Sequence, residues 1–194
     1  SLDGTSLHYG TTRIADNLML VAGQAAVVAT GATLPGSPMG IADNVIYTVR
    51  DGIRGGVDGL AIERNEITGV GDGSGDGIVL EEGIDPVALD RARVTGNRML
   101  GLRGNGILVT HRLEDADICD NQIEGVGLAA LVMAEGGAAG RLRFAGNQCR
   151  DLGQAANSET DPFDLVVADV RVLERVGRED TVAPQSKHAV AGHA

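Results

Sequence analysis

The stretch IERNEITGV, residues 62–70, is the clearest copy of a nine-residue pattern that decides the fold of this chain. Its asparagine, Asn65, stands three residues after one isoleucine and two residues before another. The same frame surrounds six of the eight asparagines, at intervals of 21 to 32 residues: Asn17, Asn44, Asn65, Asn97, Asn121 and Asn147. A short constant motif with spacers of variable length is typical of a solenoid, whose strands are fixed and whose loops vary.

Apolar residues keep constant offsets from these asparagines. Three residues before them stand Ile14, Ile41, Ile62, Val94, Ile118 and Phe144, two after them stand Met19, Ile46, Ile67, Met99, Ile123 and Cys149, and five after them stand Ala22, Val49, Val70, Leu102, Val126 and Leu152. A further apolar column follows at Val27, Ile53, Ile78, Ile107, Leu131 and Leu165. Polar residues alternate with the apolar ones around the asparagines, as in half-buried strands. The pattern predicts three short strands in every coil.

The asparagine itself lies between two predicted strands. Its amide carries donors and an acceptor, so identical side chains in successive coils can bind one another in a buried ladder. Asparagine also tolerates the left-handed backbone angles of a tight turn, and we expect the six residues to adopt them. The two remaining asparagines, Asn105 and Asn157, lie outside the frame.

This repeat resembles the right-handed parallel β-helix of the pectate-lyase-like superfamily. We therefore expect an all-β, right-handed parallel β-helix solenoid of about six coils with an asparagine ladder. Residues 1–13 would form a lead-in, residues 14–176 the β-helix domain, and residues 177–194 a polar C-terminal tail. The superfamily contains lyases, hydrolases, epimerases, phage tailspikes and proteins without catalysis, so the resemblance implies a fold and selects no activity. The analogy slightly favours an extracellular or cell-surface assembly.

Composition restricts the partners. A net charge of −11 and an isoelectric point near 4.7 argue against nucleic acid and anionic membrane as partners. No apolar run approaches the length of a membrane span. Cys149 occupies an inward position and Cys119 an outward one, so we do not expect them to pair, and cysteine usage leaves the compartment open. Because the chain starts at Ser1 and not at Met, we expect a processed or excised part of a longer polypeptide.

The outward positions beside the last apolar column decide the preferred function. They are Val28, Arg54, Val79, Leu108, Val132 and Val166, and five of the six are apolar. An apolar strip on a strand face usually marks an interface. We therefore expect a non-catalytic structural or binding module that assembles through Val28, Val79, Leu108, Val132 and Val166, with a second copy or with a larger protein.

A carbohydrate-active enzyme or carbohydrate-binding module is the alternative, with a polysaccharide as ligand and an acidic site built by the stretches 81–93, 110–117 and 153–164. Its candidate catalytic residues are Glu81, Glu82, Asp85, His111 and Glu114. Against it, the catalytic strings of the resembled enzymes are absent, and the chain has only four Tyr and Phe residues for stacking on sugars.

No cofactor is expected, although one segment partly matches a calcium loop. Asp72, Ser74 and Asp76 place oxygen atoms at alternate positions before Gly77. The position that should hold a bidentate glutamate is Gly83. A glycine-rich turn between strands is therefore favoured over a calcium site.

Overall fold

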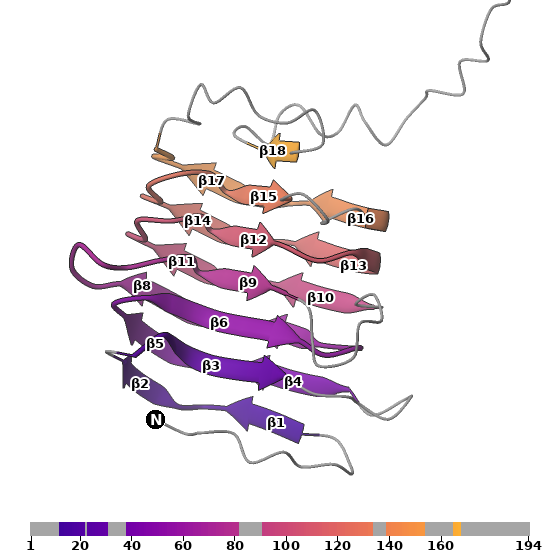
Figure 1. Cartoon of the computed structure of the whole chain (residues 1–194), viewed down its shortest axis with the longest axis horizontal. Coiled ribbons are helices and arrows are strands. Elements are labelled where there is room, and N and C mark those ends of the chain that lie inside the picture. The colour runs from indigo at the N-terminus through magenta and orange to yellow at the C-terminus, as the bar shows by residue number, and fades with distance from the viewer. Residues whose placement is uncertain are drawn as a thin grey trace, which may run out of the picture.

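The computed structural model describes residues 12–21, 23–30, 38–81, 91–133, 139–153 and 165–167. These residues form strands and no helix, so none of their segments is a helix that could cross a membrane. The strands build three six-stranded sheets that wind as a right-handed β-solenoid (Figure 1). The predicted all-β parallel solenoid is confirmed.

Each rung contributes one strand to each sheet. Sheet A contains β1 (Thr12–Ala15), β4 (Met39–Ala42), β7 (Ala61–Glu63), β10 (Ala92–Thr95), β13 (Leu113–Cys119) and β16 (Ala139–Ala145). Sheet B contains β2 (Leu18–Val21), β5 (Val45–Thr48), β8 (Glu66–Gly69), β11 (Arg98–Leu100), β14 (Gln122–Glu124) and β17 (Gln148–Arg150). Sheet C contains β3 (Ala25–Thr30), β6 (Asp51–Gly56), β9 (Ile78–Leu80), β12 (Ile107–Val109), β15 (Leu131–Met133) and β18 (Leu165–Val167).

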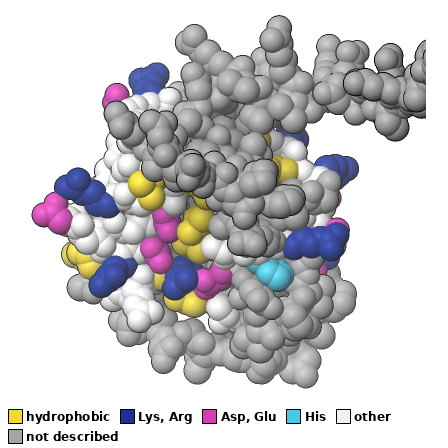
Figure 2. All heavy atoms as spheres, turned by 45° about the horizontal axis from the view of Figure 1, so that its top comes forward, with side chains coloured by type: hydrophobic (Ala, Val, Ile, Leu, Met, Phe, Trp, Pro, Cys, Tyr) yellow, Lys and Arg dark blue, Asp and Glu magenta, His cyan; other side chains and the backbone are white. Residues whose placement is uncertain are grey.

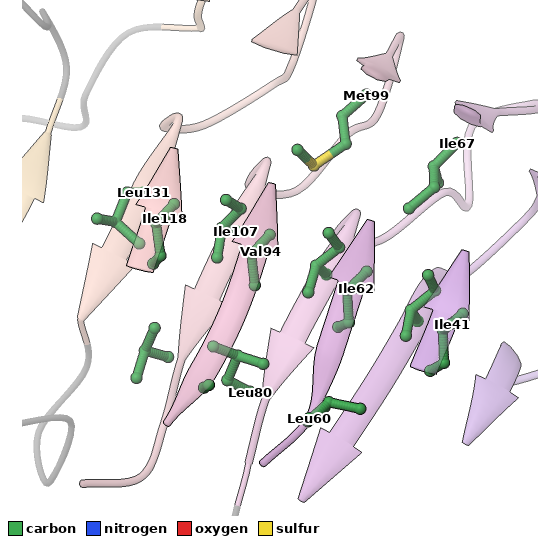
Figure 3. Close-up of a cluster of buried hydrophobic side chains, with 14 of the residues drawn as sticks. Ile41, Leu60, Ile62, Ile67, Leu80, Val94, Met99, Ile107, Ile118 and Leu131 are labelled. Atoms are coloured by element: carbon green, nitrogen blue, oxygen red, sulfur yellow. The ribbon is translucent and has the colours of Figure 1, made fainter. Parts of the chain in front are cut away.

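The predicted apolar columns are rows of directly paired residues. The first column runs across sheet A from Ile14 to Phe144 in parallel register, and the second runs across sheet B from Met19 to Cys149. Side chains from the three sheets meet inside the solenoid, where Ile62, Met99 and Ile107 are fully buried (Figure 3). Burying one such side chain contributes about 1.5–3 kcal/mol, so the repeated rows are the main source of stability.

The sixth strand of sheet C departs from the prediction. β18 pairs with β15 in the antiparallel sense, which places Leu165 opposite Met133 and not opposite Leu131. The chain therefore has fewer complete parallel turns than the six coils expected. At the other end, β1 begins at Thr12, inside the predicted lead-in. The predicted tail, residues 177–194, lies outside the described residues.

The column five residues after each asparagine is only partly internal. Leu102 and Val126 belong to the core, whereas Val70 is 44% exposed. Residues 70–77 separate β8 from β9, but only residues 101–106 separate β11 from β12. The longer connection of the third rung carries Val70 out to the surface.

The corner between sheets A and B turns at the residue before each asparagine. Those residues have positive φ: Asp16 (59°), Asp43 (58°), Arg64 (53°), Gly96 (64°), Asp120 (57°) and Gly146 (68°). The expectation that the asparagines themselves are left-handed was wrong, because none of the six has positive φ. Aspartate and glycine are among the residues that best tolerate this region, and they hold five of the six corners.

The cysteines also differ from expectation in one respect. Cys149 packs against the core, as predicted, and no disulfide joins it to Cys119. Cys119, expected to face outward, is buried, with its Sγ 3.8 Å from the carbonyl oxygen of Arg143. It lies at the end of β13, immediately before the left-handed corner residue Asp120, and the backbone of Arg143 in the next rung lies against its sulfur.

Candidate functional site

The asparagine ladder is confirmed at all five junctions. Asn17, Asn44, Asn65, Asn97 and Asn121 each donate the side-chain Nδ2–H to Oδ1 of the next asparagine, at 2.9 to 3.0 Å. The backbone N–H of the same residue donates to the same Oδ1 atom. From the second rung on, Nδ2 also donates to a backbone carbonyl of the preceding rung, for example from Asn97 to Ile62 at 2.8 Å. The ladder is therefore directional, with acceptors facing the N-terminal end.

A second, shorter ladder lies where the chain enters sheet C. Oδ1 of Asp51 accepts the N–H of Asp76 at 3.0 Å, and Oδ1 of Asp76 accepts both the N–H and the Nδ2–H of Asn105. Oδ1 of Asn105 then accepts the N–H of Ala129 at 3.3 Å. Asn105 is thus outside the main ladder, as predicted, but it is buried. Its signal in the sequence is the recurring Asp-Gly-Ile and Asn-Gly-Ile at residues 51–53, 76–78 and 105–107, of which the prediction used only the isoleucine.

Partial burial makes the carboxyl group of Asp76 a weaker acid than usual. Loss of solvent raises the pKa of its carboxyl above the ordinary value, and the hydrogen bonds from Asn105 oppose that rise. The nearby charge of Asp51 raises the pKa further. Asp76 thus places an acidic group at the ladder position that the neutral amide of Asn105 occupies in the next rung.

The outer face of sheet C carries the predicted interface row. Val28, Arg54, Val79, Leu108 and Val132 are direct partners in successive strands, and Val132 pairs with Val166 of β18. Their exposure is unequal, because Val28 is 50% exposed, Leu108 and Val132 are half-buried, and Val79 is 2% exposed. Val79 is therefore covered within the chain itself and is not available as an exposed contact. On the face turned to the viewer in Figure 2, hydrophobic side chains are interspersed with basic and acidic ones.

One charged cluster interrupts this apolar row. Nη2 of Arg54 lies 2.6 Å from Oε2 of Glu81, and its Nε lies 3.7 Å from Oδ2 of Asp51. All three side chains are partly buried. Glu81 is thus the partner of a cation and not an isolated acid.

Two of the other catalytic candidates, Glu114 and His111, lie among the described residues. Glu114 is an exposed residue of β13 in sheet A, on a different sheet, and pairs with Arg112 at 2.9 Å. His111 lies two residues after β12, and its Nε2 is buried without a hydrogen-bond partner among the described residues. Glu82 and Asp85 lie outside those residues. Of the three predicted loop stretches, 110–117 is largely strand β13.

The calcium candidates do not converge. The Asp72 side chain is 96% exposed and its Oδ1 lies 2.7 Å from Arg103. Ser74 is buried, and its Oγ accepts the backbone N–H of Arg103 at 3.1 Å. Oδ1 of Asp76 is held by Asn105. Within the described part of the chain, no group of three or more His, Cys, Asp or Glu residues could hold a metal ion.

A shallow depression lies beside the second ladder. Its volume is about 430 Å³, and Gln24, Arg50 and Asp51 line it together with three glycines. It includes none of the predicted catalytic residues. It is half open to solvent and mixed in polarity, and nothing in its lining singles out a ligand.

The outer face of sheet B holds apolar side chains that the sequence reasoning did not single out. Leu18 is 70% exposed, Leu20 is 79% exposed, and Tyr47 is 36% exposed. Leu18 pairs with Val45, and Leu20 pairs with Tyr47. Their signal was the alternation within LMLV and VIYT, which places Leu18, Leu20, Val45 and Tyr47 opposite the core-facing residues.

Comparison of the chain with protein-family models, with curated proteins and with solved structures finds no match. The fold thus defines the protein as an all-β parallel solenoid, and its function has to be inferred from its surfaces.

Proposed function

We propose that this solenoid is a non-catalytic structural or binding module that assembles through the outer face of sheet C, with a second copy of itself or with another part of a larger protein. The observation that supports this is the in-register row from Val28 to Val132. Its one charged member, Arg54, is neutralised by Glu81.

The contact would use the two ends of the row. Val28 is half exposed, and Leu108 and Val132 are partly exposed, whereas Val79, between them in the row, is buried. Aliphatic side chains in one line can pack against an equivalent line with little loss of conformational entropy, because valine has few rotamers to lose. In a closed homo-oligomer the rows would meet about a symmetry axis, giving a dimer or a trimer.

Sedimentation velocity at micromolar concentration tests the self-association. We expect an oligomer for the wild-type chain and a shift toward monomer for Val132→Asp and Val28→Asp. Gln148→Asp, at an exposed position of sheet B, is the matched control and should sediment as the wild type does. A monomeric wild type whose sedimentation is unchanged by Val132→Asp would exclude the homo-oligomer.

The second candidate is a carbohydrate-active enzyme or carbohydrate-binding module of the pectate-lyase-like kind. It is favoured by one observation, the partly buried cluster of Arg54, Glu81 and Asp51 on a strand face. A guanidinium beside carboxylates could bind an acidic sugar and assist proton transfer.

Incubation with anionic polysaccharides, with and without calcium, tests this candidate. Unsaturated products or new reducing ends that disappear in Glu81→Gln would support an enzyme. Binding without turnover would support a carbohydrate-binding module. If the chain neither turns over nor binds any of these polysaccharides, the candidate is excluded.

A further inference from the structure

Among the described residues, the two edge strands of sheet B differ in their charge. At the N-terminal end, β2 reads Leu18-Met19-Leu20-Val21 and carries no charge. At the C-terminal end, β17 carries Arg150, and sheet C ends on the antiparallel strand β18. Proteins usually protect a sheet edge with charges or irregular strands, because an uncharged apolar edge is a template for pairing with another strand.

The main ladder is also incomplete at this same end. In each asparagine from Asn44 to Asn147, Oδ1 accepts two N–H donors from the preceding rung. No described residue donates to Oδ1 of Asn17, although this side chain is partly buried. The position that precedes Asn17 in the ladder therefore calls for a backbone N–H and a side-chain amide.

The outward rows of sheet B indicate which side chains would accompany that amide. They end at Leu18 and Leu20, which lie beside Val45 and Tyr47 in the second rung. A strand added to β2 would place its own outward residues against Leu18 and Leu20 and remove apolar area from water. Apolar residues at the first and third positions after the amide-bearing residue would thus fit this edge.

The chain's own C-terminal rung fits this end poorly. Continued in the same register, a second copy would place Gln148 and Arg150 beside Leu18 and Leu20. It would also place Arg143 in the row of Arg13, and like charges on directly neighbouring strands are destabilising. Head-to-tail stacking of copies is therefore disfavoured at this end.

We propose that the first rung of the solenoid binds an extended segment of another protein by strand addition. The segment carries an asparagine that donates its N–H and Nδ2–H to Oδ1 of Asn17. Apolar residues at the first and third positions after that asparagine cover Leu18 and Leu20, and backbone hydrogen bonds to the edge of β2 supply the remaining affinity. This inference does not rest on the proposed function, because it uses the rung end and the outer face of sheet B, not that of sheet C.

A synthetic peptide with the sequence of residues 41–49 is the probe, because it has an asparagine followed by Val and Tyr at the required positions. Asp43→Gly in the peptide avoids a carboxylate beside Asp16, and two terminal lysines and a fluorescein make the peptide soluble and visible. Fluorescence anisotropy is recorded while the full chain is added. We expect saturable binding, weakened about tenfold when the peptide carries Asn44→Ala, because an amide donor to Asn17 is lost.

Variants of the chain separate this site from other adhesion. Leu20→Lys should weaken peptide binding at least about tenfold, and Leu18→Lys, a second exposed position, checks the same edge if the first variant fails to fold. Gln148→Asp, at an exposed position on the opposite edge strand of sheet B, should leave peptide binding unchanged. The inference is overturned if no peptide binds the wild-type chain, if the Asn44→Ala peptide binds equally well, or if Leu18→Lys and Leu20→Lys have no effect.

Discussion

At the scale of single residues, the asparagines stabilise the solenoid by pairing a donor with an acceptor in every rung. Asn97 donates through Nδ2 to Asn121 and to the carbonyl of Ile62, and its Oδ1 accepts both donors of Asn65. Removal of one such side chain leaves buried groups of both neighbouring rungs unpaired. An unpaired buried polar group costs more free energy than a hydrogen bond contributes.

We therefore predict that Asn97→Ala lowers the free energy of unfolding by about 1–3 kcal/mol. The loss comes from the unpaired amide groups alone, since the backbone of Asn97 is not left-handed. Urea denaturation measures it, with Gln148→Ala as an exposed amide control that should stay within about 0.5 kcal/mol of wild type. Equal losses for the two variants would refute a structural role for the ladder.

At the scale of elements, glycines set how closely the strands of sheet C follow the turns before them. A Cβ atom at Gly77 would lie 2.6 Å from the carbonyl oxygen of Gly106 and 2.9 Å from the side chains of Leu102 and Met99. At Gly40, in sheet A, a Cβ would meet only the Cγ atom of Arg13, at 3.9 Å. The same substitution should therefore have different effects in the two sheets.

Gly77→Ala is expected to destabilise the chain by about 1–3 kcal/mol, because the backbone of the next rung must shift to admit the methyl group. Gly40→Ala should be neutral or slightly stabilising, since the unfolded chain loses conformational freedom and the folded one has room. Thermal melting of the two variants compares them directly. A loss of equal size in both would mean that the close approach at Gly77 does not limit packing.

The second ladder gives the stability of sheet C a dependence on pH. The pKa of Asp76 is raised in the folded chain, mainly by burial. A carboxyl whose folded pKa exceeds the unfolded value favours the fold below the ordinary pKa of 3.8, and this contribution is lost as the pH rises through the folded pKa.

Asp76→Asn should remove this loss of stability at higher pH. An amide Oδ1 can still accept the N–H and Nδ2–H of Asn105, and the new Nδ2–H can face Asp51 without repulsion. We expect the variant to be at least as stable as wild type at pH 7, with a smaller decline between pH 4 and pH 7. Urea midpoints across that range measure it, and a variant that is less stable at pH 7 while matching wild type at pH 4 would contradict the assignment.

At the scale of the whole molecule, each rung contacts only its neighbours. In sheets A and B the hydrogen-bonded strands follow one another in strict rung order, so no strand pairing joins the first rung to the last. Stability in such a structure is a sum over rungs and the interfaces between them, and the rungs with two neighbours have the most support. The ends should therefore open first.

Hydrogen exchange should show this gradient. We expect the slowest backbone amides in β7, β8, β10 and β11, and markedly faster exchange in β1 and β2, where the ladder lacks a preceding rung. Exchange measured by mass spectrometry on peptides from each rung provides the comparison. Uniform protection from β1 to β14 would indicate one all-or-none unit and contradict the rung-by-rung account.

The sequence alone determined the solenoid, the three strands of each rung and the six asparagines of the ladder. These features could be read because every rung repeats them: Ile62, Asn65 and Ile67 have the same surroundings as their counterparts one rung away, so each copy of the pattern carries the same physical requirement. The outward row of sheet C followed from the same alternation. The candidate catalytic residues had no such repetition. In the structure, Glu114 lies on sheet A, whereas the pair of Arg54 and Glu81 belongs to the side of sheet C.

Only the tertiary structure decided the remaining features, because each depends on what the neighbouring rung places beside a residue. The burial of Val79 and the antiparallel direction of β18 are not contained in the alternation of the strands, which gives Val79 and Leu108 the same outward position. The position of the left-handed corner depends on which of two adjacent residues must point inward, and the ladder assigns that role to asparagine. The carboxylate of Asp76 became a partly buried acceptor through Asn105, which lies 29 residues away in the sequence and one rung away in space.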